Sequence, residues 1–165
     1  MSGPSAESDA AWDALMPSGR GYVLVEHPED YNLKPGIPTD VGPDRYSVTM
    51  FHQLHCLGAI RASYYANANA NANSKDPHIF GEDSLSEGQK QHARHNHINH
   101  CFDYLRQGIM CAADMTLESA MDPPPGDVRR TVDGWGIVHQ CRSWDDVLQW
   151  TLDNTAPPSN HTGLS

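Results

Sequence analysis

The chain has 165 residues and a formal net charge of −10, with 21 Asp and Glu against 11 Lys and Arg. A chain this acidic offers no basic face for nucleic-acid phosphates or anionic lipid, so we expect a small molecule or a peptide as partner and no nucleic acid. The length suits one domain, and 12 prolines and 13 glycines predict a modest core with long surface loops. No run of about 20 apolar residues occurs, so no membrane-spanning helix is expected in this sequence.

The N-terminal part of the sequence predicts one short helix, one strand and a long loop. A helix is expected over 8–16, because Ser8 can cap it and Pro17 ends it. A short strand is expected at 21–25. The segment 27–45 is punctuated by proline and glycine, which predicts an irregular connection.

Two long helices are expected in the middle of the chain. The segment 47–65 has apolar residues around most of its circumference, which is typical of a buried helix; these residues are Met50, Phe51, Leu54, Leu57 and Ile60. The segment 86–111 has one apolar stripe, formed by Ile98, Phe102, Leu105 and Ile109. An Ala-Asn repeat begins the connection between them, and we predict a flexible loop over 66–84.

The C-terminal part predicts shorter elements and a disordered end. Three consecutive prolines end any helix over 114–121, and a last helix is expected over 143–153. The tail over 157–165 is expected to be disordered. Together the patterns predict a flexible N-terminus over 1–8 and a single domain over 9–156. Its fold class is mainly α, a small helical domain with two long antiparallel helices, long irregular loops and room for a short β-hairpin.

The motif His-x-x-His-Cys occurs twice, once on each predicted long helix. On a helix, the two imidazoles of one copy are neighbours with Cβ atoms roughly 5–6 Å apart, so both rings can reach one ion. Small residues beside each pair leave room for the other helix to come close, as a metal site in the core of a helix bundle requires. The predicted ligands are His52, His55, His97 and His100. Four imidazoles can bind one ion, or two ions if further ligands join.

The remaining histidines differ in what they indicate. His139 lies two residues before Cys141, beside an apolar stretch, and is a fifth candidate ligand. His92 and His95 also have the motif spacing, but on a helix they point away from the second predicted pair and are expected to be solvated. A single pair of this spacing usually means two ordinary histidines, whereas two copies with the same trailing cysteine favour a metal. Imidazole donors suit zinc, copper, iron or nickel, and the lack of carboxylates argues against non-heme iron held by two histidines and one carboxylate.

Four cysteines allow three disulfide pairings. Cys101 and Cys111 would lie about 15 Å apart along one continuous helix, too far to bond. Of the two pairings that remain, Cys56–Cys101 with Cys111–Cys141 is favoured, because it links the two histidine helices at equivalent positions. Four reduced cysteines are the alternative.

Five blocks of sequence resemble, in order, the UstYa-type fungal mycotoxin-biosynthesis family. They are Trp12–Leu15, Phe51–Leu57, His97–Gln107, Met110–Asp114 and His139–Arg142. The likeness extends roughly from Asp9 to Trp150, and the paired motifs are highly specific to the family. Its members are typically associated with copper. They modify peptides or other secondary metabolites by oxidative macrocyclisation, hydroxylation, desaturation or halogenation.

The resemblance implies a copper-dependent oxidase that uses dioxygen or peroxide on a natural product, either a small molecule or a peptide. Copper is implied by the family alone, since the spacing of the histidines suits zinc equally well. A homodimer, or a heterodimer with a related protein, is also to be expected. The native location implied is the lumen of the secretory pathway, or a membrane-anchored state. The alternative function is a zinc-binding structural or accessory protein of a biosynthetic pathway without redox activity of its own.

Overall fold

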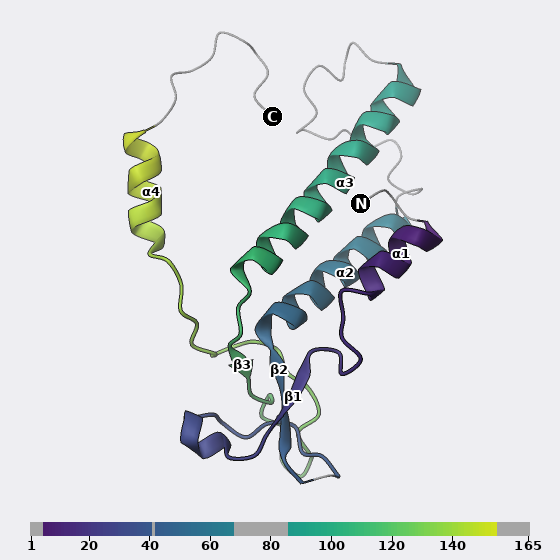
Figure 1. The fold of residues 1–165 in the computed structure, drawn as a ribbon. Helices are drawn as coiled ribbons and strands as arrows, with labels where there is room; N and C mark the ends of the chain where they lie inside the picture. Colours follow the sequence, from purple (N-terminus) through teal and green to yellow (C-terminus); the bar gives the residue numbers. More distant parts are fainter. Residues whose placement is uncertain (1–4, 41, 68–85, 155–165) are drawn as a thin grey trace.

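The computed structural model describes residues 5–40, 42–67 and 86–154, and it is mainly α, as predicted. Two long helices rise side by side from a small antiparallel sheet (Figure 1). The elements are α1 (Ala6–Asp13), β1 (Tyr22–Val25), the 3-10 helix η1 (Pro28–Tyr31), β2 (Asp44–Val48), α2 (Thr49–Asn67), α3 (Glu87–Ala112), β3 (Leu117–Glu118) and α4 (Trp144–Asp153). Within these ranges, no helix combines the length and the apolar character needed to cross a membrane.

The sheet has the order β1-β2-β3, and its middle strand continues directly into α2. Ser47 pairs with Tyr22 on one side and with Glu118 on the other. The predicted start of this helix at Ser47 is therefore wrong. Ser47 and Val48 pair with neighbouring strands of the sheet, and the helix begins only at Thr49. Tyr46 is fully buried in this strand, and its hydroxyl donates to the Lys34 carbonyl at 3.0 Å.

The segment 114–121, for which the sequence leaves a helix open, is not helical and returns to the sheet as β3. Before it reaches the sheet, this segment supplies hydrogen-bond acceptors for the first backbone amides of α2. The carbonyl of Thr116 accepts from the amide of Thr49 at 3.0 Å, and the carbonyl of Asp114 accepts from the amide of Met50 at 3.0 Å. Helix termini leave such amides without partners inside the helix. The connection from α3 to β3 therefore caps α2 and holds its N-terminus against the sheet.

The core lies between α1, α2 and α3, which run close together (Figure 1). Trp12, Leu57 and Phe102 form its buried centre. The partly buried side chains packed against it are Leu15, Tyr64, Tyr65, Ile98 and Ile109. The predicted stripe on α3 is thus confirmed except at Leu105, which is exposed. The predicted burial of α2 around most of its circumference is wrong, since Ile60 is 60% exposed and only one face meets the other helices.

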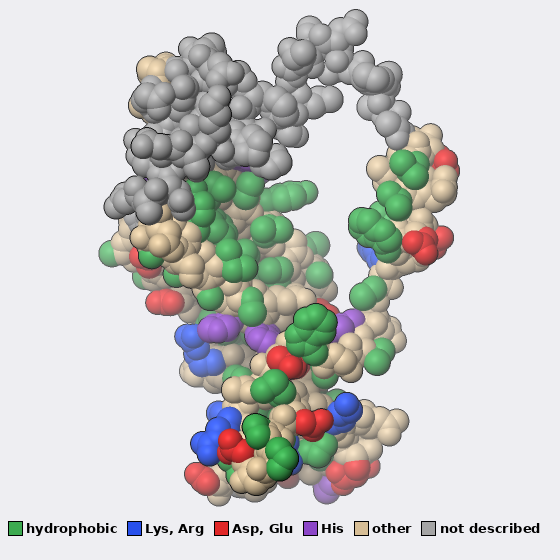
Figure 2. Space-filling model, turned by 180° about the vertical axis from the view of Figure 1, so that it is seen from behind, with side chains coloured by type: hydrophobic (Ala, Val, Ile, Leu, Met, Phe, Trp, Pro, Cys, Tyr) green, Lys and Arg blue, Asp and Glu red, His purple; other side chains and the backbone are tan. Residues whose placement is uncertain are grey.

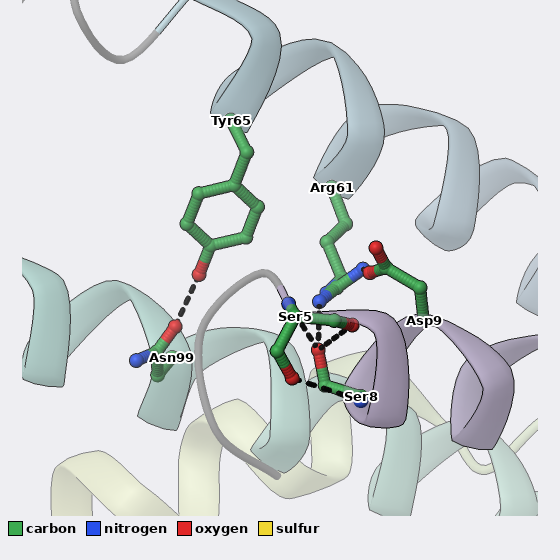
Figure 3. A network of polar contacts seen from close by, with 6 residues as sticks. All are labelled: Ser5, Ser8, Asp9, Arg61, Tyr65 and Asn99. Carbon is green, nitrogen blue, oxygen red and sulfur yellow. Dashed lines mark hydrogen bonds and ion pairs between the residues drawn. The ribbon is translucent and has the colours of Figure 1, made fainter.

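A polar network ties α1 to α2 (Figure 3). The buried Arg61 donates to the carboxylate of Asp9 at 2.8 Å and to the hydroxyl of Ser8 at 2.9 Å. The hydroxyl of Ser5 accepts from the amide of Ser8, and Ser8 caps Ser5 in return. The helix therefore begins at Ala6 instead of Ser8, because Ser5 is the capping residue. Residues 5–8 thus belong to the packed fold and not to a flexible end.

The last helix is observed where the sequence predicts it, with Ser143 as its cap. It stands apart from the other helices in Figure 1, and Trp144 and Trp150 on it are exposed. The predicted tail over 157–165 and nearly all of the predicted loop over 66–84 lie outside the described residues. Asn67 at the start of that loop is still helical.

Candidate metal and substrate site

Both histidines of the first motif lie on the N-terminal half of α2 and line one cavity. Its volume is about 340 Å³, and it lies between α2, β1 and the segment 130–132. The side chain of His52 is 22% exposed, while His55 is more open. The aromatic rings of Tyr22 and Phe51 form other parts of the wall. The predicted neighbourhood of the two imidazoles is thus found at a concave surface large enough for a small ligand.

His52 is held from behind by a buried carboxylate. Its Nδ1 lies 2.5 Å from Oε2 of Glu118, a residue of β3 that is 3% exposed. The other carboxylate oxygen accepts from the hydroxyl of Thr49 at 3.0 Å. Because an ionised carboxylate only accepts hydrogen bonds, Nδ1 of His52 is the donor in this contact, and Nε2 is the ring nitrogen that Glu118 does not engage. A histidine that binds metal through one nitrogen usually donates its other N–H in this way.

Reasoning from the sequence misses Glu118 entirely. It belongs to a strand of only two residues, in a segment for which no strand was predicted, and no motif contains it. The pairing with His52 joins residues 66 positions apart, and it depends on the antiparallel register of β2 and β3. No local pattern in the sequence contains this information.

A second imidazole–carboxylate pair lies near the same end of α2. Nδ1 of His139 is 2.8 Å from Oδ2 of Asp114, the residue whose carbonyl receives the amide of Met50. The pKa of Asp114 is lowered, chiefly because Thr116 hydrogen-bonds to its carboxylate, with a further contribution from His139. The structure therefore places His139, the fifth candidate ligand, at the same end of α2 as the first motif. Its Nε2 takes no part in the contact with Asp114.

The second motif lies at a different level of the helix pair. The hydroxyl of Tyr65 bonds to the side chain of Asn99, so these two residues mark one level of the antiparallel helices α2 and α3. His100 is next to Asn99, whereas His55 precedes Tyr65 by ten residues, about 15 Å along the axis. The structure therefore does not bring the two histidine pairs together. His100 instead stacks on Tyr104, with ring centroids 5.9 Å apart.

The possible metal donors form no larger cluster in the part of the chain that the structure describes. Within residues 5–40, 42–67 and 86–154 there is no group of three or more His, Cys, Asp or Glu side chains that could hold one ion. Two imidazoles on one cavity, one of them oriented through Nδ1, suit copper or zinc and leave coordination positions for other ligands. The metal-binding roles of all five histidines stay predictions.

The four cysteines are free thiols in this structure. Cys101 is partly buried and the other three are exposed. Neither predicted disulfide is formed, and the pairing stays a prediction.

Comparisons with known proteins agree with the resemblance noted above. The family described as "Mycotoxin biosynthesis protein UstYa" matches residues 1–154. The chain is 39% identical over 161 residues to "Oxidase ustYb" of Aspergillus flavus, covering 91% of this chain and 58% of that protein. It is 33% identical over 153 residues to "UstYa family oxidase phomYb" of Diaporthe leptostromiformis, covering 93% of this chain and 53% of that protein. It is 29% identical over 154 residues to "Chlorinase cctP2" of Talaromyces islandicus, covering 91% of this chain and 42% of that protein.

The chain spans about half the length of the curated relatives it matches. No solved structure matches it. Because the family match extends over nearly the whole chain, the chain belongs to the UstYa family.

Proposed function

We propose that this chain, a member of the UstYa family, is a copper-dependent oxidase of fungal secondary metabolism, and that His52 and His55 hold the metal. The observation that carries the proposal is the pair of imidazoles on one cavity, with Glu118 bonded to Nδ1 of His52. Relatives named as oxidases, a hydroxylase and a chlorinase support an oxidoreductase that acts on a natural product.

The residues in and behind the cavity would have different roles in such an oxidase. Glu118 keeps the proton of His52 on Nδ1, so that Nε2 is the nitrogen available to an ion. Phe51 and Tyr22 give the cavity apolar walls on which the carbon skeleton of a substrate can rest. A copper ion at the two imidazoles would supply the one-electron chemistry with dioxygen or peroxide that oxidation of a C–H bond needs.

Copper loading followed by metal analysis and EPR tests this proposal. We expect the wild-type protein to bind copper with a Cu(II) signal, and His52→Gln or His55→Gln to lose that signal. His92→Gln is the matched control, since His92 is exposed and contacts Asn96 on the same helix. A protein that retains only zinc and shows no Cu(II) signal would contradict the oxidase and favour the zinc-binding structural or accessory protein.

The second motif and the reaction need separate measurements. The double variant His97→Gln/His100→Gln decides whether that pair holds an ion of its own, because the copper content would then fall while the signal of the first pair persists. Incubation of the copper-loaded protein with metabolites of the neighbouring biosynthetic genes, followed by mass spectrometry, identifies the oxidation. The dimer and the secretory location that the resemblance implies, and the cysteine pairing that the spacing favours, stay proposals beside this one.

A further inference from the structure

We infer that the cavity in front of His52 and His55 binds its ligand through a carboxylate, which Arg20 and Arg130 receive. The inference rests on the proposed function only in taking this cavity as the substrate site. The ligand class is a small carboxylic acid or the C-terminal carboxylate of a short peptide, which present the same group to the protein.

The charge of the cavity wall is the reverse of the charge of the chain. The protein carries 21 acidic residues against 11 Lys and Arg, yet the cavity is lined by two arginines and by no Asp or Glu. Two acidic groups lie next to the wall: Glu118 is buried and already bonded to His52 and Thr49, and Asp127 contacts Arg130. Figure 2 shows Lys or Arg side chains directly beside histidine side chains on one face, between the helices and the sheet. The cavity therefore favours an anion although the net charge of the chain is −10.

Both arginines extend from backbone that is held in place. Arg20 has a positive φ of 55°, in a turn closed by its amide donating to the Pro17 carbonyl at 2.8 Å. Arg130 precedes Thr131, whose carbonyl accepts from the amide of Met121 at 2.9 Å. The guanidinium of Arg130 lies 3.5 Å from a carboxylate oxygen of Asp127, with both side chains more than half exposed. An ion pair this exposed contributes little and yields readily to a ligand.

The chemistry of the wall selects a carboxylate on an apolar body. Guanidinium groups bind carboxylates through two parallel hydrogen bonds, which gives direction as well as charge. Tyr22, Phe51 and Met16 supply apolar surface next to them. A ligand whose carboxylate meets the arginines thus places its adjoining carbons in the cavity that His52 and His55 line.

The space continues beyond this cavity along α2. A neighbouring cavity of about 420 Å³ shares Met16, Arg20 and His55 with the first and reaches Trp12 on α1. Arg20 and His55 thus lie where the two cavities meet, and the second cavity is also lined by Asp9, Asp13 and Arg61. The two volumes together leave room for a molecule larger than one amino acid.

The test uses the copper-free protein and two probes that differ only in charge, N-acetyl-L-phenylalanine and its amide. Isothermal titration and NMR shift changes measure the affinity of each. Charge-assisted hydrogen bonds contribute enough that we expect the acid to bind about tenfold more tightly than the amide. The preference should vanish in Arg20→Gln/Arg130→Gln and persist in Arg142→Gln, an exposed arginine outside the cavity.

Further probes separate the sources of the anion. N-acetyl-Ala-Ala-Phe tests the peptide form; binding tighter than the single amino acid assigns the carboxylate to a peptide, and weaker binding assigns it to a small acid. Equal affinity for acid and amide, or displacement by inorganic phosphate as effective as by acetate, would overturn the inference. Single Arg130→Gln keeps the test readable if the double variant does not fold. Because no copper is present, a failed oxidase assay and a failed carboxylate preference are distinguishable.

Discussion

Glu118 of β3 and His52 of α2 are in contact, with 2.5 Å between Oε2 of the carboxylate and Nδ1 of the imidazole. The carboxylate is nearly inaccessible to solvent and has a second partner in Thr49. This contact engages Nδ1 of His52 and leaves Nε2 as the nitrogen not bonded to Glu118, and it gives the first prediction.

Replacing Glu118 by alanine should release the proton of His52 from Nδ1. The ring would then populate the tautomer with the proton on Nε2, and the protein would lose about 1–3 kcal/mol of stability because Thr49 and His52 keep no buried acceptor. Nitrogen-15 spectra of the imidazole in copper-free protein at pH 8 measure the tautomer. Glu118→Gln should preserve it in part, since an amide oxygen still accepts. The control is Glu29→Ala, at an exposed His–Glu contact, and an unchanged tautomer in Glu118→Ala would remove the positioning role.

Gly21 should not tolerate a side chain. It has a φ of +79°, and a Cβ there would stand 2.2 Å from the Cβ of Phe51. Gly21→Ala therefore combines backbone strain with a clash at the first turn of α2, and we expect a loss of about 3 kcal/mol in urea denaturation. Gly126→Ala is the matched control, since its φ is +85° but nothing lies within 4 Å of the added carbon. Equal losses in the two variants would mean that strain alone acts and that the contact with Phe51 is unimportant.

Arg61→Lys should loosen α1 from α2. Arg61 donates to both Asp9 and Ser8 (Figure 3). Its guanidinium also lies 5.3 Å from the ring centroid of Trp12. A lysine keeps the charge but loses the fork and the stacking, so we expect about 1–2 kcal/mol lower stability and faster amide exchange in α1. Arg142→Lys should change neither. If exchange in α1 is unaffected, the network does not anchor this helix.

The ion pair of Asp103 with Arg106 on α3 should make stability depend on pH below neutrality. Hydrogen bonds from Arg106 lower the pKa of Asp103 below its ordinary value, and both side chains are less than a third exposed. A lowered folded-state pKa stabilises the protein above the unfolded value of about 3.9, and this contribution is lost as the pH falls through the folded pKa.

Asp103→Asn should therefore cost about 0.5–1 kcal/mol at pH 6 and nothing at a pH below the folded pKa. Urea denaturation at both pH values measures the difference between variant and wild type. Asp133→Asn is a control on the surface; a constant difference at the two pH values would show that the carboxylate charge is not the cause.

The sequence predicts what depends on local periodicity and fails where the register between distant segments decides. Spacing at i, i+3 places His52 and His55 on one face of a helix, and the structure has them lining one cavity. The same spacing does not predict how far along α2 a residue of α3 lies. Four histidines expected between two helices therefore separate into pairs, because the contact of Tyr65 with Asn99 fixes how far one helix slides past the other.

The boundary between β2 and α2 was predicted wrongly for a related reason. Ser47 and Val48 suit a helix as well as a strand, and only their two partners in the sheet decide between these states. The cap at Ser5 was missed because Ser8 has the same chemistry, and either serine could begin the helix.

The direct passage from β2 into α2 has a consequence for how such a site can diversify. His52 and His55 lie in the first two turns of α2, which follows β2 without a connecting loop and whose first amides are hydrogen-bonded to the segment before β3. The cavity walls come instead from separate connections, around Arg20 and around Arg130. Substitutions or insertions in these connections can reshape what the cavity accepts while His52 keeps its orientation. Related chains can in this way keep the same histidine geometry and differ in the ligands that their cavities bind.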